Sequence, residues 1–228
     1  MPHNAVQGSK YLLYIAIAFV VVLTVSNTVA SKILMIGPFV FSGAIFLFPI
    51  SYIFGDVLTE VYGYAASRKV IWSGLAALLG MSLAYWFVQH LPAAPFWPNQ
   101  GAYEAILGGV PRIVAASALA FFVGEISNSV VLSKMKIFTR GKYLWTRTIG
   151  STIVGEGFDT ALFITIAFAG TMPVASLITF IWSSYLIKVL YETLATPLTY
   201  AVVGFLKRAE GIDTFDYDVN YNPFAIRR

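Results

Sequence analysis

Acidic side chains inside long apolar segments are the residues of this chain best placed to do chemistry. Asp56 and Glu60 are four residues apart and Glu156 and Asp159 are three apart, so each pair would share one face of a helix. Such charges are tolerated in apolar segments when they face one another, water or a ligand. With nearby polar residues they form the candidate ligand-binding set: Asn27, Lys32, Asp56, Glu60, Glu125, Asn128, Glu156, Asp159, Thr160, Lys188 and Glu192.

The chemistry of this set favours a ligand that donates hydrogen bonds or carries positive charge. A carboxylate accepts two donors side by side, and several carboxylates around one site suit an anionic ligand poorly. Lys188 and Glu192 are four residues apart, so we expect them to pair directly. Tyr52, Tyr185 and Tyr191 are the candidate stacking partners for a flat ligand.

A structural role for individual charges is the alternative interpretation. Asp56, Glu60 and Lys32 would be interfacial if they fall near span ends, and Lys188 would extend its ammonium toward water. Asp56 or Glu60 would also bond to Arg68, or to a neighbouring helix, for packing alone. Because a charge at the bilayer centre costs about 2.5–3.5 kcal/mol on insertion scales, the set as a whole favours a functional interior.

The elements that must position these residues are predicted to be membrane-spanning helices. The 228-residue chain is 58% hydrophobic and 11% charged, whereas soluble domains carry about 25% charge. Its apolar runs are continuous and about twice as long as barrel strands, and roughly 20 residues cross a bilayer as a helix. The predicted spans, the first ended by Gly37-Pro38, are residues 11–35, 42–62, 70–91, 112–133, 148–169 and 174–206, with a short surface helix at 102–107.

The predicted fold is an all-α polytopic membrane bundle of six transmembrane helices in one domain, residues 1–228, with a polar cytoplasmic tail at 208–228. Three spans hold a glycine directly before an acid: Gly55-Asp56, Gly124-Glu125 and Gly155-Glu156. This likeness suggests two related three-helix halves, residues 10–92 and 111–207, as in many transporters. Alternatively, the glycines only let helices approach closely.

Lysine and arginine predict the orientation of the bundle. Cytoplasmic loops carry an excess of these residues. With both termini in the cytoplasm, twelve of the fifteen basic residues lie inside: Lys10, Arg68, Lys69, Lys134, Lys136, Arg140, Lys142, Arg147, Lys207, Arg208, Arg227 and Arg228. Because these charges sort by loop, the net charge of +4 does not indicate nucleic acid binding.

Composition excludes several classes of function. The sequence has no cysteine and only two histidines, so thiolate chemistry and a paired-histidine metal site are not expected. It has no G-x-x-x-x-G-K-[ST] phosphate loop with which to use ATP itself. For intramembrane proteolysis, His90 is the one candidate serine-activating base, and it ends a span; Asp56 with Asp159 would supply only the minimum aspartate pair. We therefore predict no enzymatic activity, no metal and no cofactor.

The sequence also resembles a known family. Residues 48–63 (FPISYIFGDVLTEVYG), followed by 66–69 (ASRK), resemble the signature of the bacterial queuosine precursor transporters. The resemblance covers essentially the whole chain, and the second span is its most specific part. It extends to further residues: Ser26-Asn27 with Lys32, residues 155–160 (GEGFDT), and Lys188 with Glu192 and Pro197.

The resemblance implies uptake of a 7-deazaguanine base for tRNA modification: preQ0 with its cyano group, preQ1 with its aminomethyl group, or queuine. On this interpretation Glu156 and Asp159 read the donor edge of the base, and Asp56 and Glu60 complete the site or form a gate. Three side chains would meet the base carbonyl: Asn27, Asn128 and Lys188. Lys188 with Glu192 would link occupancy to helix motion.

Other interpretations stay open from the sequence. In one of them the chain is a membrane substrate-binding subunit that needs an ATPase partner, because the family is also similar in overall plan to six-span vitamin-binding membrane components. In another, the chain is a carrier for a different small molecule that is cationic or rich in hydrogen-bond donors. Small residues on the third and fourth spans permit a homodimer. Because burial favours the neutral form of a carboxylate, proton coupling is a further hypothesis.

Overall fold

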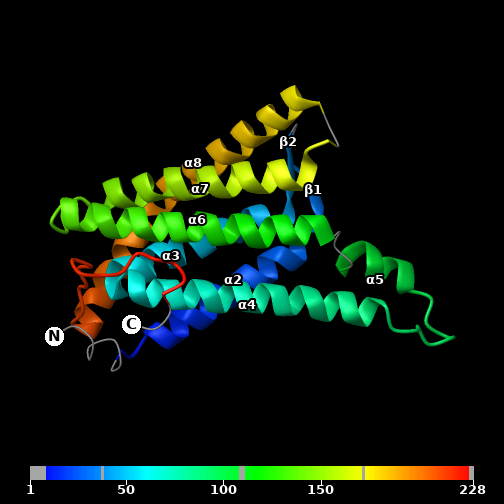
Figure 1. Ribbon diagram of the computed structural model, residues 1–228, viewed down its shortest axis with the longest axis horizontal. Helices are drawn as coiled ribbons and strands as arrows, with labels where there is room; N and C mark the ends of the chain where they lie inside the picture. Colours follow the sequence, from blue (N-terminus) through cyan, green and yellow to red (C-terminus); the bar gives the residue numbers. More distant parts are fainter. Residues whose placement is uncertain (1–8, 37–38, 108–110, 171–172, 226–228) are drawn as a thin grey trace.

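Six helices of the described structure are long and apolar enough to cross a membrane, as predicted. The computed structural model describes residues 9–36, 39–107, 111–170 and 173–225 (Figure 1). Gly37-Pro38, Arg227 and Arg228 lie outside these residues. The spans are α2 (Leu12–Val29), α3 (Phe48–Tyr62) with the 3-10 turn η1 (Gly43–Phe46), α4 (Tyr64–Gln89), α6 (Pro111–Phe138), α7 (Leu144–Phe168) and α8 (Val174–Glu210).

A β-hairpin replaces the end of the first predicted span. The helix was expected to reach residue 35, but α2 ends at Val29 and strand β1 (Ile33–Ile36) pairs antiparallel with β2 (Phe39–Ser42). The Gly43 N–H donates to the Lys32 carbonyl at 2.8 Å and closes the hairpin at its base. Pro49 therefore lies at the start of α3, where its missing N–H costs no helical hydrogen bond.

The corner between α3 and α4 is a single glycine. Gly63 has φ +84°, a backbone conformation that residues with a side chain rarely adopt, so the chain turns there without a loop. Arg68 and Lys69, which fall between the predicted spans 42–62 and 70–91, are consequently in the first turns of α4. The predicted surface helix is confirmed as α5 (Gln100–Leu107). Pro197 lies inside the continuous helix α8.

Both ends of the described chain lie at the same end of the bundle, called here the termini end (Figure 1). The backbone N–H groups of Lys10 and Tyr11 donate to the Glu210 carboxylate at 2.9 and 2.8 Å, which joins the start of α2 to the end of α8. The hairpin and α5 lie toward the opposite end (Figure 1). An even number of crossings follows from this arrangement.

The apolar surfaces divide between an interior and an outer, lipid-facing side. Phe19 and Leu23 of α2 are fully buried and pack in a cluster with Leu58 of α3 and Ile71 of α4. On α8, by contrast, leucines spaced four residues apart are more than half exposed: Leu186, Leu190, Leu194 and Leu198. Helices with apolar side chains on both sides are stable when lipid is one of their solvents.

Candidate functional site

Five predicted acidic residues come together in the interior, where α3, α6, α7 and α8 meet. Asp56, Glu125, Glu156, Asp159 and Glu192 are each at most 3% exposed. We call this group, with Asn128 and Lys188, the acidic centre. The charge on Glu125 would interact with those of the other four carboxylates, which places all five in one electrostatic neighbourhood.

Lys188 occupies one side of the acidic centre. Its Nζ lies 2.8 Å from Oε2 of Glu156 and 2.6 Å from Oδ2 of Asp159, so the ammonium joins α8 to α7. The same Nζ lies 4.6 Å from the ring centroid of Phe48 at the start of α3. The expected pairing of Lys188 with Glu192 is wrong, because the two acids of α7 bind the ammonium instead.

The other side of the acidic centre has carboxylates without a partner. Neither oxygen of Glu125 or of Glu192 accepts a hydrogen bond from any described residue. Asp56 accepts one from the Asn128 amide at 2.7 Å. A buried polar group without a partner costs free energy, and such groups in native proteins often await a ligand or proton.

Tyr52 adds a buried donor to this unpaired side. It is 1% exposed, and its hydroxyl has no hydrogen-bond partner among the described residues. The hydroxyl would be struck by a Cβ added at Gly124, so it lies against the turn of α6 that carries Glu125. Of the three predicted stacking residues, Tyr52 is the one that the structure places in the acidic centre.

The glycines that precede the acids create the space for these contacts. A Cβ at Gly55 would lie 2.6 Å from Oε2 of Glu125, and one at Gly124 would lie 2.8 Å from Cβ of Asp159. A Cβ at Gly155 would lie 3.0 Å from the Gly124 carbonyl, because α6 and α7 run side by side (Figure 1). Close approach of these helices therefore requires glycine. The prediction of two related halves stays a prediction.

Glu60 lies one helical turn from Asp56 but belongs to a different cluster. Both oxygens of its carboxylate accept hydrogen bonds from the Arg147 guanidinium, from Nε to Oε2 at 2.6 Å and from Nη2 to Oε1 at 2.8 Å. Lys207 Nζ lies 2.5 Å from Oε1, and Lys136 Nζ lies 3.5 Å from it. These four residues and Asp213, which accepts from both lysines, form what we call the Glu60 network.

Asp213 lies beyond the end of α8 and completes this network from the tail. Burial by itself raises the pKa of Asp213, but the hydrogen bonds and charges of Lys136 and Lys207 outweigh it and hold that pKa below its usual value. Sequence reasoning did not find these partners of Glu60. Arg147, Lys136 and Lys207 entered it only as cytoplasmic charges, and no local spacing links them to Glu60.

The tail after Asp213 folds back over the termini end as a strap. Arg68 Nη1 donates to the carbonyls of Asn220 and Asn222 at 2.8 and 2.7 Å, so it does not pair with Asp56 or Glu60. Asp216 Oδ2 accepts from the Tyr64 N–H at 2.8 Å and the Ser133 hydroxyl at 2.6 Å. The strap thereby connects the ends of α3, α4 and α6.

The remaining predicted site residues belong to neither the acidic centre nor the Glu60 network. Asn27 donates to the Leu23 carbonyl of its own helix at 3.0 Å, and Lys32 is exposed on the turn after α2. Thr160 is buried one residue after Asp159. Tyr185 donates to the Ile153 carbonyl at 3.2 Å, and Tyr191 packs against the apolar core.

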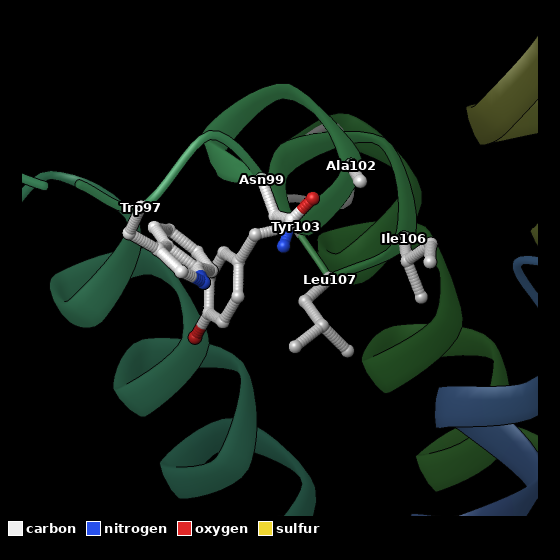
Figure 2. Close-up of a pocket in the computed structure, with 6 residues that line it drawn as sticks. All are labelled: Trp97, Asn99, Ala102, Tyr103, Ile106 and Leu107. Atoms are coloured by element: carbon white, nitrogen blue, oxygen red, sulfur yellow. The ribbon is translucent and has the colours of Figure 1, made fainter.

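Two surface pockets lie away from the acidic centre. One, at α5, is lined by aromatic and apolar side chains with Asn99 as the polar member; Figure 2 shows Trp97 and Tyr103 side by side in it. The other is an apolar groove between α2, α3 and α8, lined by Tyr11, Phe54 and Phe205 among others. Neither offers charged groups to a polar cargo.

Comparison with known proteins agrees with the membrane architecture. Residues 42–202 match the sequence model of the family described as "Putative vitamin uptake transporter". The chain is 35% identical over 156 residues to the "Probable queuosine precursor transporter" of Bacillus subtilis (strain 168), covering 68% of each chain. It is 25% identical over 162 residues to the "Queuosine precursor transporter" of Escherichia coli (strain K12), covering 71% of each. No solved structure matches. The chain therefore belongs to the vitamin uptake transporter family, in which its similarity is to the queuosine precursor transporters.

Proposed function

We propose that this chain imports a queuosine precursor, a 7-deazaguanine base, across the bacterial inner membrane for tRNA modification. The observation that carries the proposal is the acidic centre: five buried carboxylates at the meeting of four spans, two of them without a partner among the described residues. The names of the two relatives point to the same cargo. The family assignment argues for transport rather than catalysis.

The chemistry of the base fits the side chains of the centre. A deazaguanine presents an N–H and an amino group along one edge, and a carboxylate accepts both, as acidic residues do when they read a base edge. Tyr52 or Phe48 would contact the face of the ring. The base carbonyl would accept from Asn128 or from Lys188, whose ammonium already bridges Glu156 and Asp159.

The termini end is proposed to face the cytoplasm. Ten of the twelve basic residues predicted to be inside are described, and the Glu60 network and strap lie at that end, with Lys136, Arg147 and Lys207 paired there. On this orientation the network closes the cytoplasmic side while the cargo enters from the opposite side. Release into the cytoplasm would then require the ends of α6, α7 and α8 to separate.

Equilibrium binding to the purified protein tests the cargo. Wild type should bind 7-deazaguanine precursors more tightly than guanine, and Glu156→Gln and Asp159→Asn should each weaken binding tenfold or more, about 1.4 kcal/mol. Glu104→Gln is the control, because Glu104 is exposed on α5, far from the centre. A well-folded wild type that binds no precursor would contradict the assignment.

Reconstitution separates a self-sufficient carrier from a subunit. If the chain is a self-sufficient carrier, the purified chain alone in liposomes should take up labelled precursor without ATP, which it has no phosphate loop to use. Transport that appears only with an added ATPase would instead assign the chain as a membrane substrate-binding subunit.

A further inference from the structure

The charges of the acidic centre do not balance. Five carboxylates share one ammonium, and Lys188 is already bound by Glu156 and Asp159. Asp56, Glu125 and Glu192 therefore have no ion-pair partner in the part of the chain that the structure describes. Isolated buried carboxylates are costly, so this side of the centre needs a proton or a positively charged ligand, which the described side chains do not supply.

The Glu60 network is an example, in the same protein, of a buried carboxylate whose charge is fully paired. Glu60 is as deeply buried as Glu125, yet it is surrounded by Arg147, Lys136 and Lys207. Glu125 receives none of this compensation. The contrast separates a structural carboxylate from one that is left available to a ligand.

A second observation points to a ligand in the same place. The hydroxyl of Tyr52 is buried and unpartnered, and its electrostatic neighbours are the carboxylates of Asp159, Glu156, Glu125 and Asp56. The rings of Tyr52 and Phe48 lie 5.8 Å apart, next to the Lys188 ammonium. An unused donor, an aromatic pair and unpaired carboxylates together fit a flat ring that carries a cationic substituent.

An organic cation fits this side better than a metal ion does. No group of three or more acidic or histidine side chains among the described residues is arranged to hold a metal ion. The unpaired carboxylates come from three helices, Asp56 from α3, Glu125 from α6 and Glu192 from α8.

We infer that Asp56, Glu125 and Glu192 form a subsite for the positively charged substituent of the cargo, and that Glu125 and Glu192 determine specificity for it. This inference rests on the proposed function. Within that cargo class it assigns the aminomethyl base, which is protonated at neutral pH, as the preferred ligand over the neutral cyano base. Glu156 and Asp159, held by Lys188, act on the ring itself.

Paired titrations of the two bases test the subsite. Wild type should bind 7-aminomethyl-7-deazaguanine at least tenfold more tightly than the 7-cyano compound, about 1.4 kcal/mol. Glu125→Gln and Glu192→Gln should each reduce that ratio to threefold or less by weakening the aminomethyl base alone. Glu104→Gln should leave the ratio unchanged.

The outcomes distinguish this inference from the proposed function. If wild type binds both bases equally, or if Glu125→Gln and Glu192→Gln weaken both bases to the same extent, the subsite is wrong and the cargo class stands. If folded wild type binds neither base, the proposed function itself fails. Size-exclusion profiles and melting temperatures establish folding of each variant, and the glutamines keep the shape of the replaced side chains.

Discussion

Glu60 and Glu125 are two fully buried glutamates on spans of the same bundle with opposite surroundings. Glu60 accepts a two-oxygen contact from Arg147 and lies near two lysines, whereas Glu125 has no hydrogen-bond partner among the described residues. Removing one partner of a buried ion pair is strongly destabilising, because the other charge is left alone. Burial alone therefore does not distinguish a carboxylate that is held in ion pairs from one that has no partner; the contacts of each carboxylate do.

The same substitution at the two glutamates should give the largest contrast in stability. Glu60→Gln leaves Arg147, Lys136 and Lys207 with only Asp213 as a counter-charge, and should cost about 3–5 kcal/mol. Glu125→Gln breaks no ion pair and should change the free energy of unfolding by less than about 1 kcal/mol. Thermal unfolding in detergent, followed by tryptophan fluorescence, measures both. Equal losses would remove the distinction between the two glutamates.

A methyl group at Gly124 should damage the acidic centre itself. The added Cβ would meet the Tyr52 hydroxyl and the Cβ of Asp159, and overpacking of this kind costs about 1–3 kcal/mol. Gly124→Ala should therefore lower the melting temperature and weaken precursor binding together. Gly80→Ala is the matched control, since a Cβ there meets nothing within 4 Å and alanine favours a helix. A Gly124→Ala protein that binds normally would place the ligand elsewhere.

Acid should weaken the Glu60 network by a small amount through Asp213. Because the folded-state pKa of Asp213 is below its unfolded value, its contribution is present above about pH 4, the unfolded pKa, and is lost as the pH falls through the folded pKa. The side chain is 46% exposed, so the contribution should be a fraction of about 1 kcal/mol.

The measurement for Asp213 is a comparison of melting temperatures from pH 7 to pH 3. The melting temperature of wild type should be higher than that of Asp213→Asn at pH 7, and the difference between the two should shrink below about pH 4. Asp218→Asn is the control, because Asp218 is exposed on the same tail. A difference that persists unchanged at pH 3 would show that Asp213 acts by packing rather than by charge.

Local patterns in the sequence predicted much of the fold, and the predicted set of polar residues contains all seven residues of the acidic centre together with four that lie outside it: Asn27, Lys32, Glu60 and Thr160. Continuous apolar runs gave the spans, and helical spacing placed Glu156 with Asp159 on one face. The short helix α5 also followed from its loop. The hairpin did not, since the apolar residues 33–36 read equally well as the last turn of a span.

The ion-pair partners of the acidic residues were harder to predict than the helix faces on which these residues lie. The four-residue spacing of Lys188 and Glu192 permits a contact along α8, but the fold brings Glu156 and Asp159 of α7 closer to the ammonium. Likewise Asp56 and Glu60 share one face of α3, yet a turn of about 6 Å is enough to assign them to different clusters. Which acid keeps a partner depends on contacts between distant helices, and spacing along one helix does not encode them.

The Glu60 network also sets an order of events during synthesis. Glu60 emerges from the ribosome long before Arg147, and Lys207 and Asp213 come near the end of the chain. When α3 first enters the bilayer, its glutamate has none of its final partners, and a lone charge there is costly. Compensation of the charge on α3 must therefore wait for α6, α7 and α8. A chain that stops before residue 136 contains none of the three basic partners of Glu60, so its early helices still carry an uncompensated charge.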